Sequence, residues 1–308
     1  MTSLHSDSPL LRNPQRPRAH RPAAHPASRP GAGVEIRHDA TIDTAWVTMQ
    51  PRPGQALNFS PALLDAFDAA FAHWEANGCK WEDDDGSLLP VHYAVLRSAH
   101  PQYFSIGGDL ALFNDCITRG DFDALRAYSR RCMDLTYRWA CHVAHHATTI
   151  SLVQGRALGG GFESALSSDY VIAEEQSEFG LPEILFGLFP CSGGMPLLAR
   201  RIGLARAQRM MTDGRLYKAA ELLEMGVIDE VCAQGHGERA VRRFIAEHSR
   251  ARGARHALQL ARQRMQPLDL REMAAVVDDW VDVARGLSTA NLRVLDTLTR
   301  MQSSEFGQ

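Results

Sequence analysis

The chain has 308 residues, a formal net charge of −3 and 45% hydrophobic residues, enough to bury one large core in a soluble protein. Its nearly balanced charge creates no overall field that would attract nucleic acid or an anionic membrane. No run approaches the ~18 apolar residues that a membrane-spanning helix needs, so we expect a cytoplasmic protein.

The N-terminal segment, residues 1–33, differs in composition from the rest of the chain. It holds five Arg, three His and six Pro, and it has no apolar stretch of the kind found in a secretory signal. A Pro-rich segment with so little to bury cannot offset the entropy of ordering. We therefore expect a disordered segment that ends where a globular pattern starts, at Val34.

The globular part opens with two strands and a helix. Residues 34–36 and 45–49 are typical of strands flanked by turns. Ser60 suits a helix N-cap, with Pro61 at the first helical position. One apolar face then recurs at helical spacing, formed by Leu63, Leu64, Phe67, Ala70, Phe71 and Trp74. The acidic turn at 82–86 is predicted to be a solvated loop.

Strands and helices continue to alternate through the middle of the chain. We predict strands at 91–96, 149–153 and 170–173, and a long helix over 121–146. Before that helix, a glycine turn leads to Asp109, which we interpret as a helix N-cap. Alternation of this kind predicts an α/β core.

After Val231 the pattern is wholly helical. Asp269 and Glu272 have the spacing of a capping box at a helix start, and the apolar face that follows includes Trp280. An apolar stripe on a terminal helix is usually core or an oligomer contact. We therefore divide the folded part into a core at 34–237 and a helical region at 238–308.

The six cysteines are widely spaced, with no CxxC pair and no Cys/His pairing. This pattern argues against a zinc site and a disulfide framework, and it suits a reducing compartment. His145 and His146 are adjacent on a predicted helix, so their side chains diverge, and no carboxylate recurs at ligand spacing. We expect neither a bound metal nor a cofactor.

Glu163 and Glu183 are the most informative residues, because each is a lone carboxylate in an apolar stretch. Glu163 follows a triple glycine at 159–161, and Glu183 follows Pro182. An unpaired carboxylate in such surroundings is costly and its pKa must rise. Two carboxyls with separately tuned pKa values can act as an acid/base pair. The glycines at the helix start offer free N–H groups for an oxyanion.

A simpler interpretation exists for either glutamate alone. Negative charge is favoured in the first turn of a helix, so both residues could be ordinary surface glutamates. The triple glycine and the Leu-Pro-Glu turn, taken together, favour the catalytic interpretation.

Three motifs, in order, resemble the crotonase (enoyl-CoA hydratase/isomerase) superfamily: residues 104–110, 155–163 and 180–183. Residues 189–194 and 219–229 fit the same pattern, and the resemblance covers about 34–300. It implies a spiral of ββα units, with C-terminal helices that cover the active site and build a trimer or a dimer of trimers.

Within this superfamily the sequences at 107–113, 180–186 and 280–282 are most similar to those of bacterial diffusible-signal-factor synthases. Residues 191–194 differ from the sequence expected of the synthases at this position. This resemblance implies dehydration of a medium-chain 3-hydroxyacyl thioester of acyl carrier protein, followed by thioester hydrolysis. The product would be a cis-2-unsaturated fatty acid, a quorum-sensing signal.

The resemblance also implies site residues and partners. The backbone N–H groups of Gly108 and Gly160 would form the oxyanion hole, Glu163 and Glu183 would be catalytic, and substrate would contact Leu158 and Trp280. Which glutamate serves which step stays open. Acyl carrier protein would deliver the substrate, and binding of a sensor protein as an added role is a further alternative.

Two other functions stay open. The main alternative is a generic enoyl-CoA hydratase or isomerase, which leaves its product as a CoA thioester. The second is a crotonase-like protein that mainly binds a partner. Some relatives bind RNA through a lysine-rich helix, and the presence of only Lys80 and Lys218 in the whole chain argues against that.

Overall fold

The computed structural model describes residues 28–31, 33–51 and 57–304. Most of the expected N-terminal disordered segment, residues 1–27, lies outside the described residues. The expectation of disorder is wrong for Ser28–Gly31, which form strand β1 at the edge of a sheet. A strand is held by backbone hydrogen bonds to its neighbour, which do not require apolar side chains.

The larger sheet has seven strands in the order β1-β2-β3-β6-β8-β10-β13. Strands β2 (Val34–Asp39) and β3 (Thr44–Met49) pair antiparallel, and every pairing from β3 onward is parallel. β3 is buried along its whole length, as is typical of a strand covered on both faces. The remaining strands are β6 (Tyr93–Ser98), β8 (Thr148–Val153), β10 (Tyr170–Glu174) and β13 (Glu230–Cys232).

A smaller sheet of four strands, in the order β12-β11-β9-β7, brings the three sequence motifs together. β7, β9 and β11 are mutually parallel, so their carboxyl ends meet at one edge. From that edge the chain leads to the first glycine turn, to the triple glycine and to the Leu-Pro-Glu turn. The strands are β7 (Tyr103–Ser105), β9 (Arg156–Leu158), β11 (Glu178–Gly180) and β12 (Leu216–Lys218).

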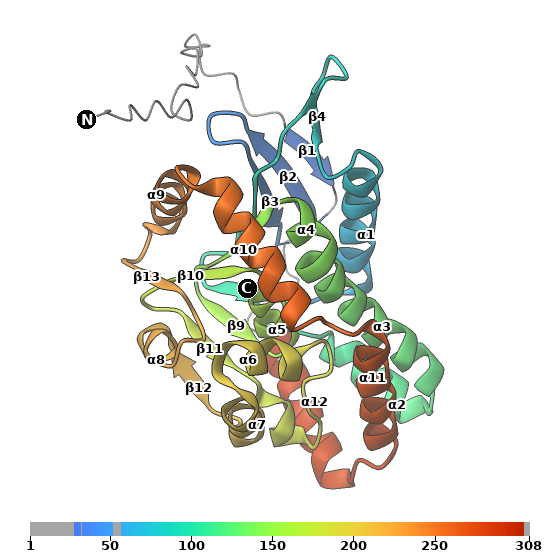
Figure 1. Ribbon diagram of the computed structural model, residues 1–308. Coiled ribbons are helices and arrows are strands. Elements are labelled where there is room, and N and C mark those ends of the chain that lie inside the picture. Colours follow the sequence, from blue (N-terminus) through green and yellow to red (C-terminus); the bar gives the residue numbers. More distant parts are fainter. Residues whose placement is uncertain (1–27, 32, 52–56, 305–308) are drawn as a thin grey trace, which may run out of the picture.

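Helices cover both faces of the larger sheet (Figure 1), which confirms the expected α/β class. Helix α9 (Gly237–Ser249) packs against β8 and β10, where Phe244 joins a cluster with Trp46 and Ile150. The opposite face carries the main core, to which α1 (Pro61–Ala76) contributes five buried side chains. As expected, Ser60 caps α1 by accepting a hydrogen bond from the N–H of Leu63.

The long helix expected over 121–146 is present but not uniform. It consists of α3 (Phe122–Tyr137), a π-helical segment at Arg138–Val143 and α4 (Ala144–His146). The sequence pattern did not predict the π-helical segment, because a local widening of a helix leaves the apolar periodicity nearly unchanged.

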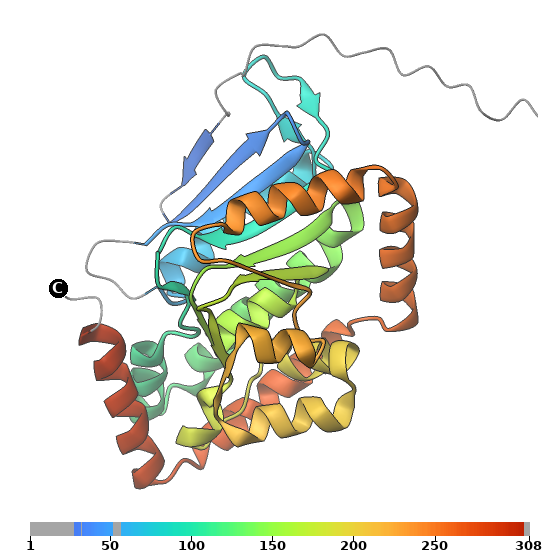
Figure 2. The ribbon, with the colours of Figure 1, turned by 90° about the vertical axis from the view of Figure 1, so that its left-hand side faces the viewer.

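Every described element after β13 is helical, as expected. α10 (Arg252–Met265) is followed by α11 (Leu270–Arg285), which begins with Asp269 as its N-cap and packs against α3. α12 (Thr289–Ser304) lies beside α2 (Leu110–Arg119) near the C-terminal end (Figure 2).

The remaining elements are short. The acidic turn expected to be a loop is the tip of a two-stranded hairpin, β4 (Trp81–Glu82) and β5 (Leu88–Leu89). Four helices and one 3₁₀ helix complete the described chain: α5 (Gly160–Leu166), η2 (Pro182–Phe186), α6 (Gly194–Ile202), α7 (Leu204–Asp213) and α8 (Ala219–Glu224).

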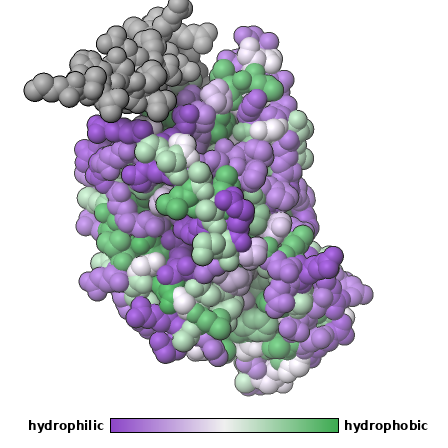
Figure 3. All heavy atoms as spheres, viewed as in Figure 1, coloured by the Kyte–Doolittle hydropathy of each residue, from purple (hydrophilic) through white to green (hydrophobic). Residues whose placement is uncertain are grey.

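Hydrophilic and hydrophobic residues are mixed over the face seen in Figure 3. Within the part of the chain that the structure describes, no helix is both long and apolar enough to cross a membrane. All six cysteines are free thiols.

Candidate active site

The triple glycine lets three segments approach one another closely. Gly159 has a φ of +51°, which favours glycine, and a Cβ at this position would lie 2.5 Å from Oε1 of Glu183. A Cβ on Gly161 would lie 2.4 Å from the backbone oxygen of Ser105. These glycines are therefore required by contact with β7 and with the second glutamate.

Glu163 lies in the first turn of α5 (Gly160–Leu166) and is 2% exposed. Its Oε1 accepts hydrogen bonds from the N–H groups of Ser192, at 2.9 Å, and Gly194, at 2.7 Å. Burial raises the pKa of Glu163 to about 7, while these two backbone donors oppose the rise by stabilising the ionised form.

Glu183 lies in η2, directly after Pro182, and its surroundings are different. Its Oε2 is buried and has no hydrogen-bond partner among the described residues. Burial, together with the nearby carboxylate of Glu163, raises the pKa of Glu183 to about 8. The two carboxyls are therefore close enough to repel each other, and each titrates near neutral pH.

The two glycines expected to form an oxyanion hole lie next to each other. A methyl group added to Gly160 would lie 3.7 Å from the backbone nitrogen of Gly108. Among the described residues, no backbone or side-chain acceptor is paired with either N–H. Two unpaired donors at adjacent positions can hold an oxyanion.

Tyr128 of α3 fixes the turn that carries Gly108. Its hydroxyl accepts a hydrogen bond from the N–H of Asp109, at 2.9 Å, and donates one to the backbone oxygen of Phe59, at 2.7 Å. Asp109 caps α2 through the N–H of Leu112, as expected. Sequence reasoning missed Tyr128, because nothing in a helical tyrosine indicates which distant backbone groups it will bind.

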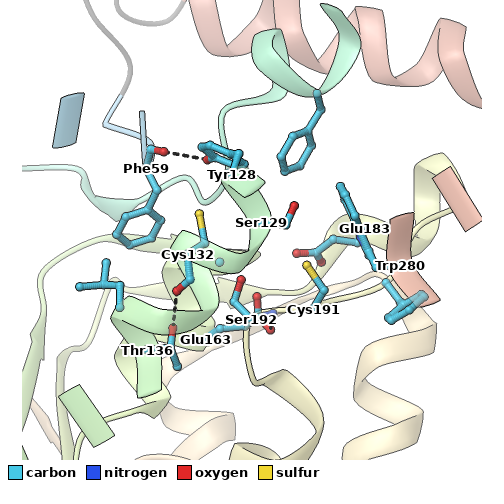
Figure 4. A pocket seen from close by; sticks show the side chains of 15 residues that line it. Phe59, Tyr128, Ser129, Cys132, Thr136, Glu163, Glu183, Cys191, Ser192 and Trp280 are labelled. Carbon is cyan, nitrogen blue, oxygen red and sulfur yellow. Dashed lines mark hydrogen bonds between the residues drawn. The ribbon is translucent and has the colours of Figure 1, made fainter. Parts of the chain in front are cut away.

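One pocket brings these groups together (Figure 4). Residues of α3, α5, η2, the loop before α6, and α11 line it. Both glutamates, both oxyanion glycines and Trp280 line it. Its other lining residues are Phe59, Phe113, Tyr128, Ser129, Cys132, Leu135, Thr136, Phe189, Cys191 and Ser192.

The two expected substrate-binding residues have different outcomes. Trp280 is 1% exposed, lines the pocket and meets the Phe113 ring edge-on, with centroids 5.1 Å apart. Leu158 is not among the residues that line the pocket, and its side chain packs against Tyr103 and Ile106. The backbone oxygen of Leu158 instead packs closely against the first glycine turn, since a Cβ on Gly107 would lie only 2.6 Å from it.

Sequence reasoning missed the polar stripe that α3 presents to the pocket. Ser129, Cys132 and Thr136 are three and four residues apart and therefore share one helix face. The available signal was their spacing within an otherwise apolar face. It could not show which cavity that face would line.

The arrangement has the parts of an acid/base site for carbonyl chemistry. Two carboxyls that titrate near neutrality face the same space as two unpaired backbone donors. In the described residues, no group of three or more His, Cys, Asp or Glu side chains could hold a metal ion. The groups present suit removal or delivery of a proton next to a carbonyl whose oxygen is held by the N–H groups.

Comparison with known proteins agrees with this chemistry. An enoyl-CoA hydratase/isomerase family model matches residues 82–281. A probable enoyl-CoA hydratase of Mycobacterium leprae is 32% identical over 189 residues, which cover 61% of this chain and 68% of that protein.

Solved structures share the fold over most of their length. An enoyl-CoA hydratase from Bacillus halodurans superposes with a TM-score of 0.69 at 20% identity, covering 86% of this chain and all of that one. DspI of Pseudomonas aeruginosa superposes with a TM-score of 0.63 at 25% identity, covering 87% of this chain and 96% of that one. The spiral fold expected from the motifs is therefore confirmed, together with its C-terminal helices.

Proposed function

Because the chain belongs to the enoyl-CoA hydratase/isomerase family, we propose that it makes a cis-2-unsaturated fatty-acid signal from a 3-hydroxyacyl carrier-protein thioester. The family places it among crotonase-type enzymes with hydratase/isomerase-type activity. The proposal adds a medium-chain substrate, an acyl carrier protein and a second step that hydrolyses the thioester.

The observation that carries the proposal is the pair of buried carboxyls beside two unpaired backbone donors. With the thioester oxygen held by the N–H groups of Gly108 and Gly160, loss of a proton from C2 gives an enolate whose charge those donors stabilise. One such donor contributes on the order of 3 kcal/mol to the transition state.

Dehydration then needs one carboxylate and one neutral carboxyl. The carboxylate takes the proton from C2, the C3–O bond breaks with its electron pair on oxygen, and the neutral carboxyl protonates that oxygen to give water. The electrons of the C2–H bond become the C2–C3 double bond. Glu163 and Glu183, with pKa values raised to about 7 and about 8, carry one proton between them over the intervening pH range.

Hydrolysis would reuse the same groups. A carboxylate takes a proton from a water molecule as the water oxygen attacks the thioester carbon, and the oxyanion is held by the same two N–H groups. When the tetrahedral intermediate collapses, the C–S bond breaks and the carrier thiol leaves with a proton. The free unsaturated acid is released.

The more specific parts of the proposal rest on the resemblance of the sequence around the two glutamates to the signal synthases. The cis geometry, the free acid and the carrier protein come from that resemblance, as does the added role of binding a sensor protein. Trp280 and Phe113 supply an aromatic wall that suits an acyl chain.

We also propose that the protein assembles as a homotrimer or a dimer of trimers. Helix α10 carries two apolar side chains that are largely exposed, Leu258 at 72% and Met265 at 84%. They are seven residues apart and therefore share one face of the helix, where a second copy of the chain could contact both; the assembly itself is what the resemblance implies. Light scattering should give the mass of a trimer or a hexamer, and a monodisperse monomer would contradict this part.

Product analysis tests the proposed function. Purified protein is incubated with 3-hydroxydodecanoyl carrier protein and, in parallel, with the matching CoA thioester, and the products are separated by mass spectrometry. We expect free cis-2-dodecenoic acid, formed faster from the carrier-protein substrate. If the only product is a trans-2-enoyl thioester and both substrates react equally, the protein is a generic enoyl-CoA hydratase.

A further inference from the structure

One side chain in the pocket has no task in the reaction described above. Ser129 lies in α3 and is 1% exposed, and its Oγ is buried without a hydrogen-bond partner among the described residues. A buried hydroxyl left unpaired is costly, since its hydrogen bonds to water are lost and nothing replaces them. Alanine would fit the same helix position without that cost.

A second hydroxyl on the same helix face does have a partner, so the position in the helix does not by itself leave the Ser129 hydroxyl unpaired. Thr136, two turns further along α3, donates its hydroxyl to the backbone oxygen of Cys132 at 3.2 Å. This is the usual way for a hydroxyl in a helix to find a partner. Ser129 makes no such bond and faces the pocket instead.

A second unpaired polar atom faces the same space. Oε2 of Glu183 is also buried without a partner among the described residues. In Figure 4 the Ser129 hydroxyl and the Glu183 carboxyl both point into the pocket, with the carboxyl directed toward the region where Ser129 lies. Two unpaired groups in one pocket are complementary to a ligand atom that can both donate and accept hydrogen bonds.

We propose that Ser129 is a substrate-binding residue, which holds the oxygen on C3 of the substrate within reach of Glu183. The inference rests on the proposed function, because a hydroxyl on C3 is the group that leaves. A serine hydroxyl can accept a bond from that hydroxyl in the bound state. It can turn to donate one as the C3–O bond breaks and charge develops on the oxygen.

Ser129 keeps its own proton throughout the step. The proton that converts the departing oxygen to water comes from the neutral carboxyl of the glutamate pair, and the C2 proton goes to the other carboxyl. The serine contributes one hydrogen bond to an oxygen that becomes charged. Loss of such a bond corresponds to a decrease of about tenfold to a hundredfold in rate.

The test compares Ser129→Ala with Ser177→Ala. Ser177 is also fully buried but lies outside the pocket, and its hydroxyl accepts from the N–H of Gly155 and donates to the oxygen of Val153. Ser129→Ala should keep or raise the melting temperature while lowering kcat for dehydration about tenfold to a hundredfold. Ser177→Ala should lower the melting temperature and leave kcat unchanged.

A second measurement separates oxygen binding from a general disturbance of the pocket. A saturated acyl thioester has no oxygen on C3, and its C2 proton can still exchange with D₂O through the carboxylate and the oxyanion hole. Ser129→Ala should exchange this proton at close to the wild-type rate. An equal loss of exchange and dehydration, or no loss of dehydration, would overturn the proposal.

The same assay tests the proposed function separately, through release of the free acid by wild-type protein. If wild-type protein dehydrates the substrate but releases no free acid, the signal-synthase proposal fails, and the Ser129 comparison is still decided by the dehydration rates. If the free acid forms and Ser129→Ala forms it at the wild-type rate, the Ser129 inference fails alone.

Discussion

The two catalytic candidates are the same residue type in two different environments. Glu163 lies in the first turn of a helix and accepts two backbone hydrogen bonds through one oxygen. Glu183 lies in a short 3₁₀ helix, and one of its oxygens has no partner in the described part of the chain. Both pKa values are raised by burial, to about 7 and about 8 respectively.

The difference shows how one pocket can hold an acid and a base made from identical side chains. Burial raises both pKa values, and the backbone donors at Ser192 and Gly194 then hold that of Glu163 below that of Glu183. Glu163 therefore ionises first as pH rises, and Glu183 keeps its proton longer. Geometry, rather than residue type, assigns the protonation states.

The largest expected effect is the loss of either carboxyl. Glu163→Gln and Glu183→Gln should each lower kcat for dehydration by about 10²–10⁴-fold, because each removes a group that must carry a proton. Both variants should fold, since the amide oxygen of Glu163→Gln can still accept from the N–H groups of Ser192 and Gly194, and Glu183→Gln removes no hydrogen bond to Oε2 among the described residues. Steady-state kinetics with circular dichroism checks this, and near wild-type turnover by either variant would exclude that residue from the mechanism.

Bulk at Gly160 tests the oxyanion hole, which both glutamates depend on. The nearest atoms to an added methyl group lie at 3.7–3.8 Å, so Gly160→Ala should fold normally. That methyl group would occupy space next to the N–H of Gly108. We expect kcat to fall about 10-fold or more for Gly160→Ala and further for Gly160→Val, whose branched side chain would displace the donor.

Gly107→Ala is not a useful comparison, because its φ of +89° and a 2.6 Å contact with the oxygen of Leu158 would disturb the turn itself. A folded Gly160→Val protein with normal activity would show that the oxyanion hole has been misplaced.

Several residues singled out from the sequence lie together in one pocket, and the signals that pointed to them are local. Glycines at a helix start and a lone Glu after Pro182 are recognisable from neighbouring residues alone. The four-stranded sheet that brings the motifs together was not predicted, because each of its strands has only three residues and is too short to show a period.

What could not be predicted depends on contacts between distant segments. Tyr128 binds backbone groups of Asp109 and Phe59, and the Leu158 side chain packs against Tyr103 and Ile106 instead of lining the pocket. The two backbone N–H groups that hold the pKa of Glu163 below that of Glu183 belong to Ser192 and Gly194, about 30 residues after Glu163. No local pattern encodes such pairings.

Trp280 lines the pocket on the side where Glu183 lies, so its replacement tests whether the acyl chain runs along that side (Figure 4). If the ring lines the path of the acyl chain, Trp280→Ala should raise KM more for twelve-carbon than for four-carbon substrates, by about tenfold. Assays over a series of chain lengths measure this. Equal losses at all lengths would assign the ring a purely structural role.

The smallest expected effect concerns stability. A carboxyl whose pKa is raised in the folded state contributes stability that is present at low pH and is lost as pH rises through about 8. The unfolded chain loses the Glu183 proton near the ordinary value of 4.5, whereas the folded protein keeps it up to about 8, so stability falls by about 1.4 kcal/mol per pH unit between these two values and is constant above them.

Glu183→Gln cannot ionise in either state, so it escapes the loss of about 2.7 kcal/mol that wild type undergoes between pH 6 and 8, and its melting temperature relative to wild type should be about 4–8 °C higher at pH 9 than at pH 6. Thermal unfolding at the two pH values measures this. The same difference at both would mean that Glu183 titrates at the value of an exposed glutamate.

The most direct test of the shared proton is the pH dependence of kcat/KM for dehydration by wild-type protein. Below about 7 both carboxyls are neutral and no base is available, and above about 8 both are ionised and no acid is available. The account predicts a bell-shaped profile with its maximum between these values. A rate that stays constant from pH 5.5 to 9.5, or a profile with a single limb near 4.5, would contradict it.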